Sequence, residues 1–267
     1  MRPMSAPGPL AIAFPVVFRI GPLALPAHLA FESLAYFLGF HIYLALRRRW
    51  SDDLSENTRW SVLAAAAVGA AIGSRALGWL DHPAEAWAHR TDVTWLLGGK
   101  TIVGGLIGGL VAVELTKRAI GERRSTGDLY ALPLCVGMAV GRVGCFLGGL
   151  PDHTYGTATS LPWGVDFGDG VRRHPTQLYE IAALGMIALW IRSARPRLFA
   201  RKLERGDLFR GFLAFYLAFR IAVDVLKPEA RPWLGLSGIQ LAGVAGLLYY
   251  ARDLPRIVLG IRSRPHG

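Results

Sequence analysis

Four basic residues interrupt stretches of the chain that are otherwise apolar, and they are its clearest candidates for chemistry: Arg75, Lys100, Arg142 and Arg220. A cation at the centre of a membrane helix costs roughly 2.5–3.5 kcal/mol, so four of them favour one shared polar cavity. The planar fork of arginine suits phosphate oxygens. We therefore expect the cavity to hold a phosphate, such as that of a phospholipid head group. Pairing with carboxylates or helix-end carbonyls, for packing alone, is the alternative for each cation.

Three carboxylates in apolar stretches are candidate partners for these cations. Asp224 follows Arg220 by four residues, which places both side chains on one face of a helix. Glu32 and Glu180 stand in other apolar stretches and could serve in the same way. At about 1.5 Å of rise per residue, all four cations lie roughly 9–12 Å below the same membrane boundary.

A polar segment, Arg-His-Pro-Thr-Gln-Leu-Tyr-Glu at 173–180, supplies further candidates. Pro175 suits the first position of a helix, whose positive dipole end would then face the proposed head-group site. Gln177 and Glu180 are three residues apart and share a face of that helix. His174 lies at the expected water boundary, where a general base could work. The alternative is an ordinary helix N-terminus with an exposed histidine.

Composition indicates what kind of protein must position these groups. Hydrophobic residues make up 52% of the 267 residues and charged residues only 18%, with a mean hydropathy of +0.33. Soluble domains carry about 25% charged residues, so the composition argues against a water-soluble enzyme. The high apolar content excludes a disordered chain. The two cysteines, Cys135 and Cys145, are separated by about 15 Å of helical rise, which is too far for a disulfide bond.

Seven apolar stretches have the roughly 20 residues that a membrane-spanning helix requires. They lie at 28–46, 60–80, 93–116, 129–149, 176–194, 208–227 and 234–251. The expected fold class is therefore an all-α polytopic membrane protein with seven transmembrane helices. Prolines interrupt any signal-peptide core near the N-terminus. We expect an extracytoplasmic arm at 1–27, a transmembrane domain at 28–251 and a basic cytoplasmic tail at 252–267.

This topology also explains the net charge of +11. Nineteen basic residues fall in the tail and in the loops 47–59, 117–124 and 192–210, against seven on the opposite side. Basic residues mark the cytoplasmic side, which puts the N-terminus outside and the C-terminus inside. The pI near 10.2 therefore needs no nucleic-acid partner. The chain shows no internal repeat, and its charges cluster away from the midplane, which argues against a transporter or channel.

Five motifs together resemble the bacterial prolipoprotein diacylglyceryl transferase family, over nearly the whole chain from Ile20 to Gln240. They are Gly-Ser-Arg at 73–75, Gly-Gly-Leu-Ile-Gly-Gly at 104–109, Gly-Arg-Val-Gly-Cys-Phe at 141–146, the segment at 173–180 and Phe-Arg-Ile-Ala-Val-Asp at 219–224. The fourth is the most specific. The resemblance implies a multi-pass enzyme of the bacterial inner membrane. Such an enzyme moves the diacylglyceryl group of phosphatidylglycerol to the thiol of a lipobox cysteine in a prolipoprotein, and glycerol phosphate leaves.

The resemblance also implies site residues. Two essential arginines of the family match Arg142 and Arg220, an acidic residue matches Asp224, and a glycine matches Gly156. With the candidates found above, the expected catalytic residues are Arg142, Arg220, His174 and Asp224. The expected substrate-binding residues are Arg75, Lys100, Gly156, Gln177, Tyr179, Glu180, Gln240 and His28.

The sequence departs from the family pattern at positions that bear on activation of the thiol. Val103 stands where the family has a histidine in the third span, and Cys145 where it has an asparagine. The tyrosine of the first span falls near His28, and Asp152 is the nearest counterpart of an outer-loop acidic residue. A cationic cavity would itself lower the pKa of an acceptor thiol. His174 or His28 is expected to take the proton.

The expected partners are phosphatidylglycerol, prolipoprotein signal peptides and membrane lipids, with no nucleic acid. We expect no cofactor and no metal, because the seven histidines show no ligand spacing. Cys145 is expected to be a small packing residue. Two alternatives remain: a paralogue that transfers a phospholipid-derived group to a different acceptor, and a non-catalytic phospholipid-binding membrane protein.

Overall fold

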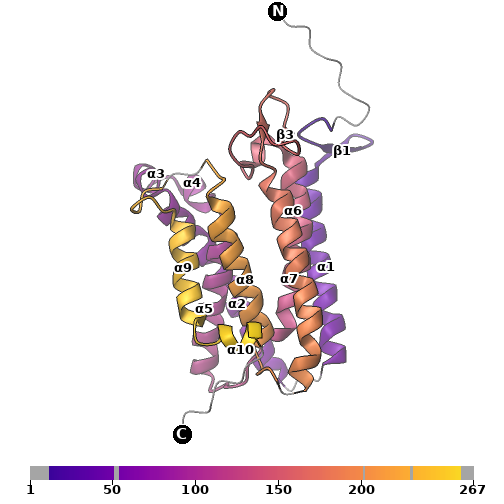
Figure 1. The fold of residues 1–267 in the computed structure, drawn as a ribbon, viewed down its shortest axis with the longest axis vertical. Helices are drawn as coiled ribbons and strands as arrows, with labels where there is room; N and C mark the ends of the chain where they lie inside the picture. Colours follow the sequence, from indigo (N-terminus) through magenta and orange to yellow (C-terminus); the bar gives the residue numbers. More distant parts are fainter. Residues whose placement is uncertain (1–11, 51–53, 201, 229–230, 260–267) are drawn as a thin grey trace, which may run out of the picture.

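The computed structural model describes residues 12–50, 54–200, 202–228 and 231–259 of the chain, which are mostly helical. Among them, seven helices of 13 residues or more run between two ends of the molecule (Figure 1). They are α1 (Ala27–Arg49), α2 (Glu56–Asp81), α5 (Ile102–Ala119), α6 (Asp128–Gly148), α7 (Thr176–Phe199), α8 (Asp207–Asp224) and α9 (Gly238–Tyr250). Three of these, α1, α2 and α6, are long and apolar enough to cross a membrane. The chain is therefore a helical membrane protein.

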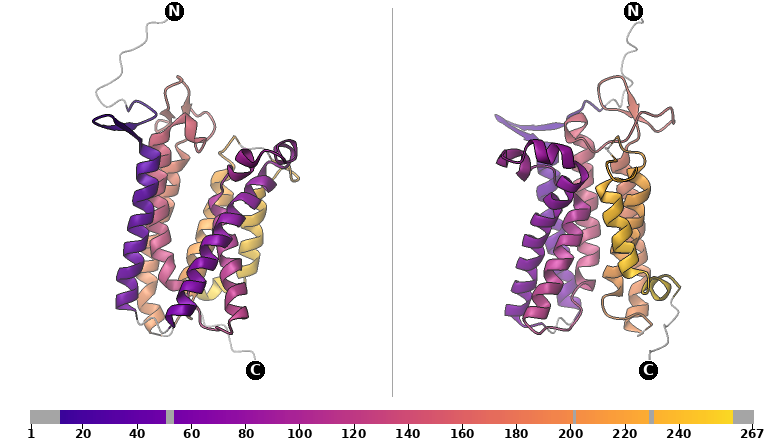
Figure 2. Two further views of the ribbon diagram at one scale, coloured as in Figure 1. Left: turned by 180° about the vertical axis from the view of Figure 1, so that it is seen from behind. Right: turned by 90° about the vertical axis from the view of Figure 1, so that its left-hand side faces the viewer.

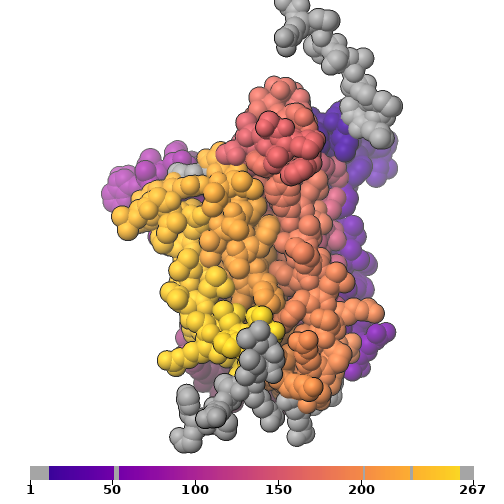
Figure 3. Space-filling model, in the orientation of Figure 1, coloured from indigo at the N-terminus to yellow at the C-terminus, as the bar shows by residue number. Residues whose placement is uncertain are grey.

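Shorter elements lie at the two ends of these helices. The antiparallel pair β1 (Val17–Ile20) and β2 (Leu23–Pro26) precedes α1, and a second pair, β3 (Val165–Asp166) and β4 (Arg172–Arg173), lies between α6 and α7. The helices α3 (Pro83–Ala88) and α4 (Val93–Leu97) and the 3₁₀ turn η1 (Leu150–Asp152) are at the same end, and α10 (Leu254–Leu259) is at the other (Figure 1). Figure 3 shows the α6–α7 connection as a bulge above α7 at this end of the molecule.

The long helices form two packed groups (Figure 2). In one, α6 packs against both α1 and α7; in the other, α2 packs against α5 and α9 against α8. Contacts of α8 with α6 and α7 join the groups. The buried core follows this junction, with Leu184 of α7 and Leu208, Phe212 and Leu217 of α8 all nearly inaccessible. The core therefore holds together the three helices that carry the candidate site.

Glycines allow α2 and α5 to approach each other closely. A Cβ atom on Gly108 of α5 would lie only 2.8 Å from the Cα atom of Gly73 in α2. Gly104 meets the same helix one turn earlier. Small residues spaced by four are the usual basis of such contacts in membranes, and the tight packing predicted from the glycines of 104–109 is confirmed.

One predicted span is wrong at its start, and this changes the place of Lys100. The stretch 93–116 does not form one helix, because the chain turns at Gly99 with a φ of +58°. A new helix then begins after Thr101, whose hydroxyl accepts a hydrogen bond from the Gly104 amide at 3.2 Å. Lys100 therefore lies in an exposed link before α5 and not within a span.

Candidate active site

The candidate site forms where α6, α7 and α8 meet. α6 contributes Arg142, α7 contributes Glu180, and α8 contributes Tyr216, Arg220 and Asp224. The three residues of α8 follow one another at intervals of four, so they share one face of that helix. This face points into the core, because each of the three side chains is at most 3% exposed.

Glu180 links the two arginines. Its Oε1 lies 2.9 Å from Nε of Arg142, and its Oε2 lies 3.1 Å from Nη1 of Arg220. The Tyr216 hydroxyl donates a third contact to Oε1 at 2.7 Å. A buried charge is stable only when it is paired and hydrogen-bonded. Glu180 therefore explains how two guanidinium groups can lie side by side in the core.

Asp224 stands on the other side of Arg220. Its Oδ1 lies 3.9 Å from Nη2 of Arg220, as the spacing of four residues predicts. Its Oδ2 accepts a hydrogen bond from the hydroxyl of Ser237 at 2.5 Å. Ser237 is itself held in a capping box with Gln240 at the start of α9. Gln240 thus positions the partner of Asp224, and its Nε2 donates to the carbonyl oxygen of Ile221 at 3.4 Å.

The arginines have more donors than these carboxylates use. Each guanidinium carries five N–H groups, yet Nε of Arg220 is buried without a hydrogen-bond partner among the described residues. Leaving a charged donor unsatisfied in a core is costly. The centre is therefore able to accept a further oxygen ligand.

A second polar group lies where the start of α1 meets the end of α6. Nδ1 of His28 lies 2.6 Å from Oδ1 of Asp152, and Nη1 of Arg142 lies 3.6 Å from Sγ of Cys145. The lack of a side chain at Gly144 lets α6 pack closely against α1 here, because a Cβ at Gly144 would lie 3.2 Å from Cα of His28. Arg142 therefore contacts both polar groups.

Gln177 supports this second group from α7. Its Nε2 donates to the Thr154 hydroxyl at 3.0 Å, and that hydroxyl donates to Oδ2 of Asp152 at 2.6 Å. Oε1 of Gln177 is buried with no hydrogen-bond partner among the described residues. Gln177 and Glu180 thus share a buried face of α7, as predicted. Gln177 contacts the group around Asp152 through Thr154, and Glu180 contacts the two arginines.

His174 forms a third arrangement with two aromatic residues, Tyr179 of α7 and Trp163 of the α6–α7 connection. Its Nδ1 lies 3.2 Å from the hydroxyl of Tyr179, which also accepts a hydrogen bond from Nε1 of Trp163 at 2.8 Å. Gly156 packs against His174, where a Cβ would lie 2.8 Å from the Cβ of the histidine. Gly156 is thus needed for close packing beneath His174.

The structure does not bring Arg75 or Lys100 into the arginine–carboxylate centre. Arg75 donates to the carbonyl oxygens of Leu97 and Ala71 at 3.1 and 2.8 Å, so it ties α2 to the end of α4. Such contacts agree with the alternative stated above, in which an intramembrane arginine pairs with helix-end carbonyl groups and serves packing alone. Lys100 is exposed beside this region.

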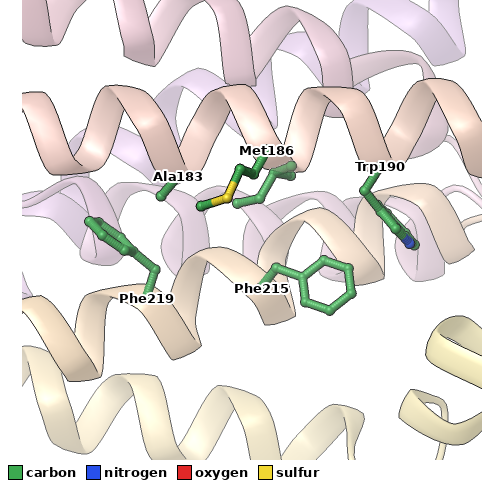
Figure 4. A pocket seen from close by; sticks show the side chains of 6 residues that line it. Ala183, Met186, Trp190, Phe215 and Phe219 are labelled. Atoms are coloured by element: carbon green, nitrogen blue, oxygen red, sulfur yellow. The ribbon is translucent and has the colours of Figure 1, made fainter.

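An apolar groove opens beside the centre. It has a volume of about 300 Å³, lies between α7 and α8, and is lined by Ala183, Met186, Ile187, Trp190, Phe215 and Phe219 (Figure 4). Ala183 is one turn beyond Glu180, and Phe219 immediately precedes Arg220. The groove thus leads away from the buried charges along two helices.

The sequence did not single out several residues of these groups. Tyr216 and Ser237 were missed, although the spacing of four between Tyr216 and Arg220 was a usable signal. The sequence predicts a packing role for Cys145, and residue spacing carries no signal for its position beside Arg142, His28 and Asp152. Both cysteines are free, as predicted.

Comparison with known proteins identifies relatives of the chain. A family model described as prolipoprotein diacylglyceryl transferase matches residues 15–252. The phosphatidylglycerol–prolipoprotein diacylglyceryl transferase of Bordetella bronchiseptica is 34% identical over 249 residues, which cover 85% of this chain and 87% of the relative. The protein of the same name from Cupriavidus necator is 32% identical over 272 residues, covering 92% and 90%. That from Geobacter sulfurreducens is 34% identical over 241 residues, covering 83% and 85%.

Proposed function

The chain belongs to the prolipoprotein diacylglyceryl transferase family, and we propose that it transfers the diacylglyceryl group of phosphatidylglycerol to the lipobox cysteine of prolipoproteins. The observation that carries the proposal is the buried centre of Arg142, Glu180 and Arg220. A phosphodiester that enters this centre can accept hydrogen bonds that the carboxylates leave unused, including that of the buried Nε of Arg220.

We propose that the chain lies in the inner membrane of a bacterium and crosses it seven times. The distribution of basic residues supports an outside N-terminus and a cytoplasmic C-terminus. The arginine centre is then reached from the outer leaflet, and prolipoprotein signal peptides approach it from the same membrane. The groove between α7 and α8 supports the lipid assignment, because its apolar lining starts one turn from Glu180 and can take an acyl chain.

The proposed reaction is a nucleophilic displacement at the glycerol carbon that bears the phosphate. The thiolate sulfur of the acceptor forms a bond to this carbon while the carbon–oxygen bond to the phosphate breaks. The electron pair of that bond leaves with glycerol phosphate. Arg142 and Arg220 stabilise the charge that grows on the phosphate oxygens, and Asp224 holds Arg220 in place through its contact at 3.9 Å.

The proton of the acceptor thiol goes to a base at the outer end of the bundle. His28 and His174 are the two candidates from the sequence. His28 lies closer to the arginine centre along the contacts of the structure, because Arg142 contacts Cys145 and Cys145 adjoins His28 and Asp152. His174 is held by Tyr179 at 3.2 Å and is shielded by the loop that contains Gly156.

Substitution of either arginine tests the proposal. Arg142→Ala and Arg220→Ala should each abolish release of glycerol phosphate from labelled phosphatidylglycerol, with removal of a transition-state donor costing about 10²–10³-fold or more in rate. Arg192→Ala is the matched control, because Arg192 is exposed on α7. If either centre variant inserts normally and keeps near-normal transfer, the phosphate assignment is wrong.

A change of acceptor is the second candidate function. The observation that favours it is Val103, which is 1% exposed and offers no titratable group where the family has a histidine. Complementation of a strain depleted of its own diacylglyceryl transferase separates the two. Growth supports prolipoproteins as acceptors, and mass spectrometry of labelled products would reveal a different one if growth fails.

A further inference from the structure

Three side chains of metal-ligand type meet at the outer ends of α1 and α6 and the turn η1. Ligand atoms of His28, Cys145 and Asp152 all lie within 4.8 Å of one another, and all three residues are partly buried. Nδ1 of His28 is 2.6 Å from Oδ1 of Asp152, yet it makes no hydrogen bond of good geometry among the described residues. The three side chains therefore lie close enough to contact one ion, although Cys145 also contacts Arg142 at 3.6 Å.

The chemistry of this donor set suits zinc. Imidazole nitrogen, thiolate sulfur and carboxylate oxygen are the three ligand types that zinc accepts in proteins, and a site with three protein ligands leaves one position open. In a tetrahedral site with bonds of about 2.0–2.3 Å, ligand atoms stand roughly 3.3–3.8 Å apart. Small rotations of the three side chains would bring their ligand atoms to this spacing.

Surrounding residues orient the ligands as the supporting contacts of a metal site do. Oδ2 of Asp152 is occupied by the hydroxyl of Thr154 at 2.6 Å, which leaves Oδ1 for an ion. On the far side of the imidazole, Oε2 of Glu32 lies 3.9 Å from Nε2 of His28. A carboxylate near the second ring nitrogen favours ligation through the first.

The local charges also fit a divalent cation. A thiolate at Cys145 and the Asp152 carboxylate together balance the two positive charges of the ion. Arg142 lies 3.6 Å from the sulfur, but its guanidinium is paired with Glu180 at 2.9 Å. That pairing reduces the repulsion that a nearby cation would otherwise feel.

We propose that His28, Cys145 and Asp152 bind a zinc ion that activates the acceptor thiol, a role that rests on the proposed function. The acceptor thiol would take the open position as a thiolate, and a hydroxide ion held there would accept its proton and leave as water. In this scheme His28 is a ligand, and His174 is the base candidate that stays free of the ion. The sulfur then attacks the glycerol carbon, and the broken carbon–oxygen bond leaves its electron pair on glycerol phosphate. No oxidant or reductant takes part. This replaces the expectation of a metal-free protein, which rested on histidine spacing alone.

Metal content tests the site directly. The full-length chain, purified in detergent, is loaded with zinc chloride, passed through gel filtration and analysed by elemental mass spectrometry. We expect about one zinc ion per chain in the wild type and in the control Cys135→Ala, and a loss of more than tenfold in Cys145→Ser and Asp152→Asn. Thr154→Val should lower zinc affinity about 10–100-fold. Cobalt loading should give a thiolate-to-cobalt absorption band that Cys145→Ser lacks.

The outcomes separate this proposal from the function on which it rests. A wild type that retains no zinc, or a Cys145→Ser variant that retains all of it, overturns the site. A zinc-free Cys145→Ser variant with wild-type transfer overturns the role in thiol activation and leaves the proposed function intact. A zinc-loaded wild type that releases no glycerol phosphate supports the site and contradicts the proposed function.

Discussion

The buried carboxylate of Glu180 allows a quantitative prediction. It is 3% exposed and is contacted by Arg142, Arg220 and Tyr216 at 2.9, 3.1 and 2.7 Å. Glu180→Gln keeps the shape and the oxygen that accepts from Tyr216, but it removes the negative charge between two guanidinium groups. Removing one partner of a buried ion pair costs about 3–5 kcal/mol. For a chain of this size each kcal/mol shifts Tm by about 2–4 °C, so Tm should fall by about 6–20 °C.

Lipid should recover part of this loss if the centre binds phosphate. A phosphatidylglycerol head group would supply the anion that Glu180→Gln removes, so adding the lipid should raise the Tm of the variant more than that of the wild type. Diacylglycerol, which has the same chains without a phosphate, is the control lipid. Thermal unfolding in detergent micelles, with and without each lipid, measures both effects.

The control variant is Glu114→Gln, which makes the same chemical change at a carboxylate that pairs with Lys117 at 2.9 Å and is 44% exposed. It should lose no more than about 1 kcal/mol. A Glu180→Gln variant that unfolds within about 1 kcal/mol of the wild type would refute the role of Glu180 in neutralising buried charge. Equal stabilisation by diacylglycerol and phosphatidylglycerol would refute phosphate binding at the centre.

Two further predictions concern the scaffold. Gly108→Ala should destabilise the chain by about 1–3 kcal/mol, because the new Cβ would lie 2.8 Å from Cα of Gly73. In the control Gly105→Ala, the new Cβ would lie 3.7 Å from its nearest neighbour, so this variant should unfold like the wild type. Equal Tm values for the two variants would contradict the close packing of α2 and α5. Arg256→Ala should cost about 1.5–3 kcal/mol and speed proteolysis of the C-terminal segment, because Arg256 holds the fully buried Asp207 at 2.9 Å from α10. The exposed Arg252→Ala is its control, and equal cleavage of both would refute the anchor.

Local patterns in the sequence were sufficient for much of the arginine centre. Spacing of four residues placed Asp224 beside Arg220, and the glycines of 104–109 predicted the tight contact of α5 with α2. Embedding in apolar sequence identified Arg142, Arg220 and Glu180 as buried charges. These predictions succeeded because helical periodicity and the cost of burying charge act over short stretches of chain.

Other features depend on how distant segments meet, which periodicity does not encode. The break before α5 arises from the turn at Gly99 and moves Lys100 out of the bundle. The histidine, cysteine and aspartate of the proposed zinc site come from α1, α6 and η1, so no ligand motif is visible in the sequence. Val103, Cys145 and His28 stood out as departures from a family pattern, and two of these three meet at one place with Asp152.

Arg142 connects the two parts of the chemistry. Its Nε faces Glu180 and the centre proposed to hold the leaving phosphate, while its Nη1 faces Cys145 and the site proposed to activate the nucleophile. A displacement requires the nucleophile and the leaving group on opposite sides of one carbon. The attacking sulfur must also lie within about 3–3.5 Å of that carbon. A single guanidinium between the two sites fixes their separation. Replacing Arg142 should therefore lower turnover more than losing either its contact with Glu180 or its contact with Cys145 alone. Arg220, in contrast, contributes only at the phosphate side.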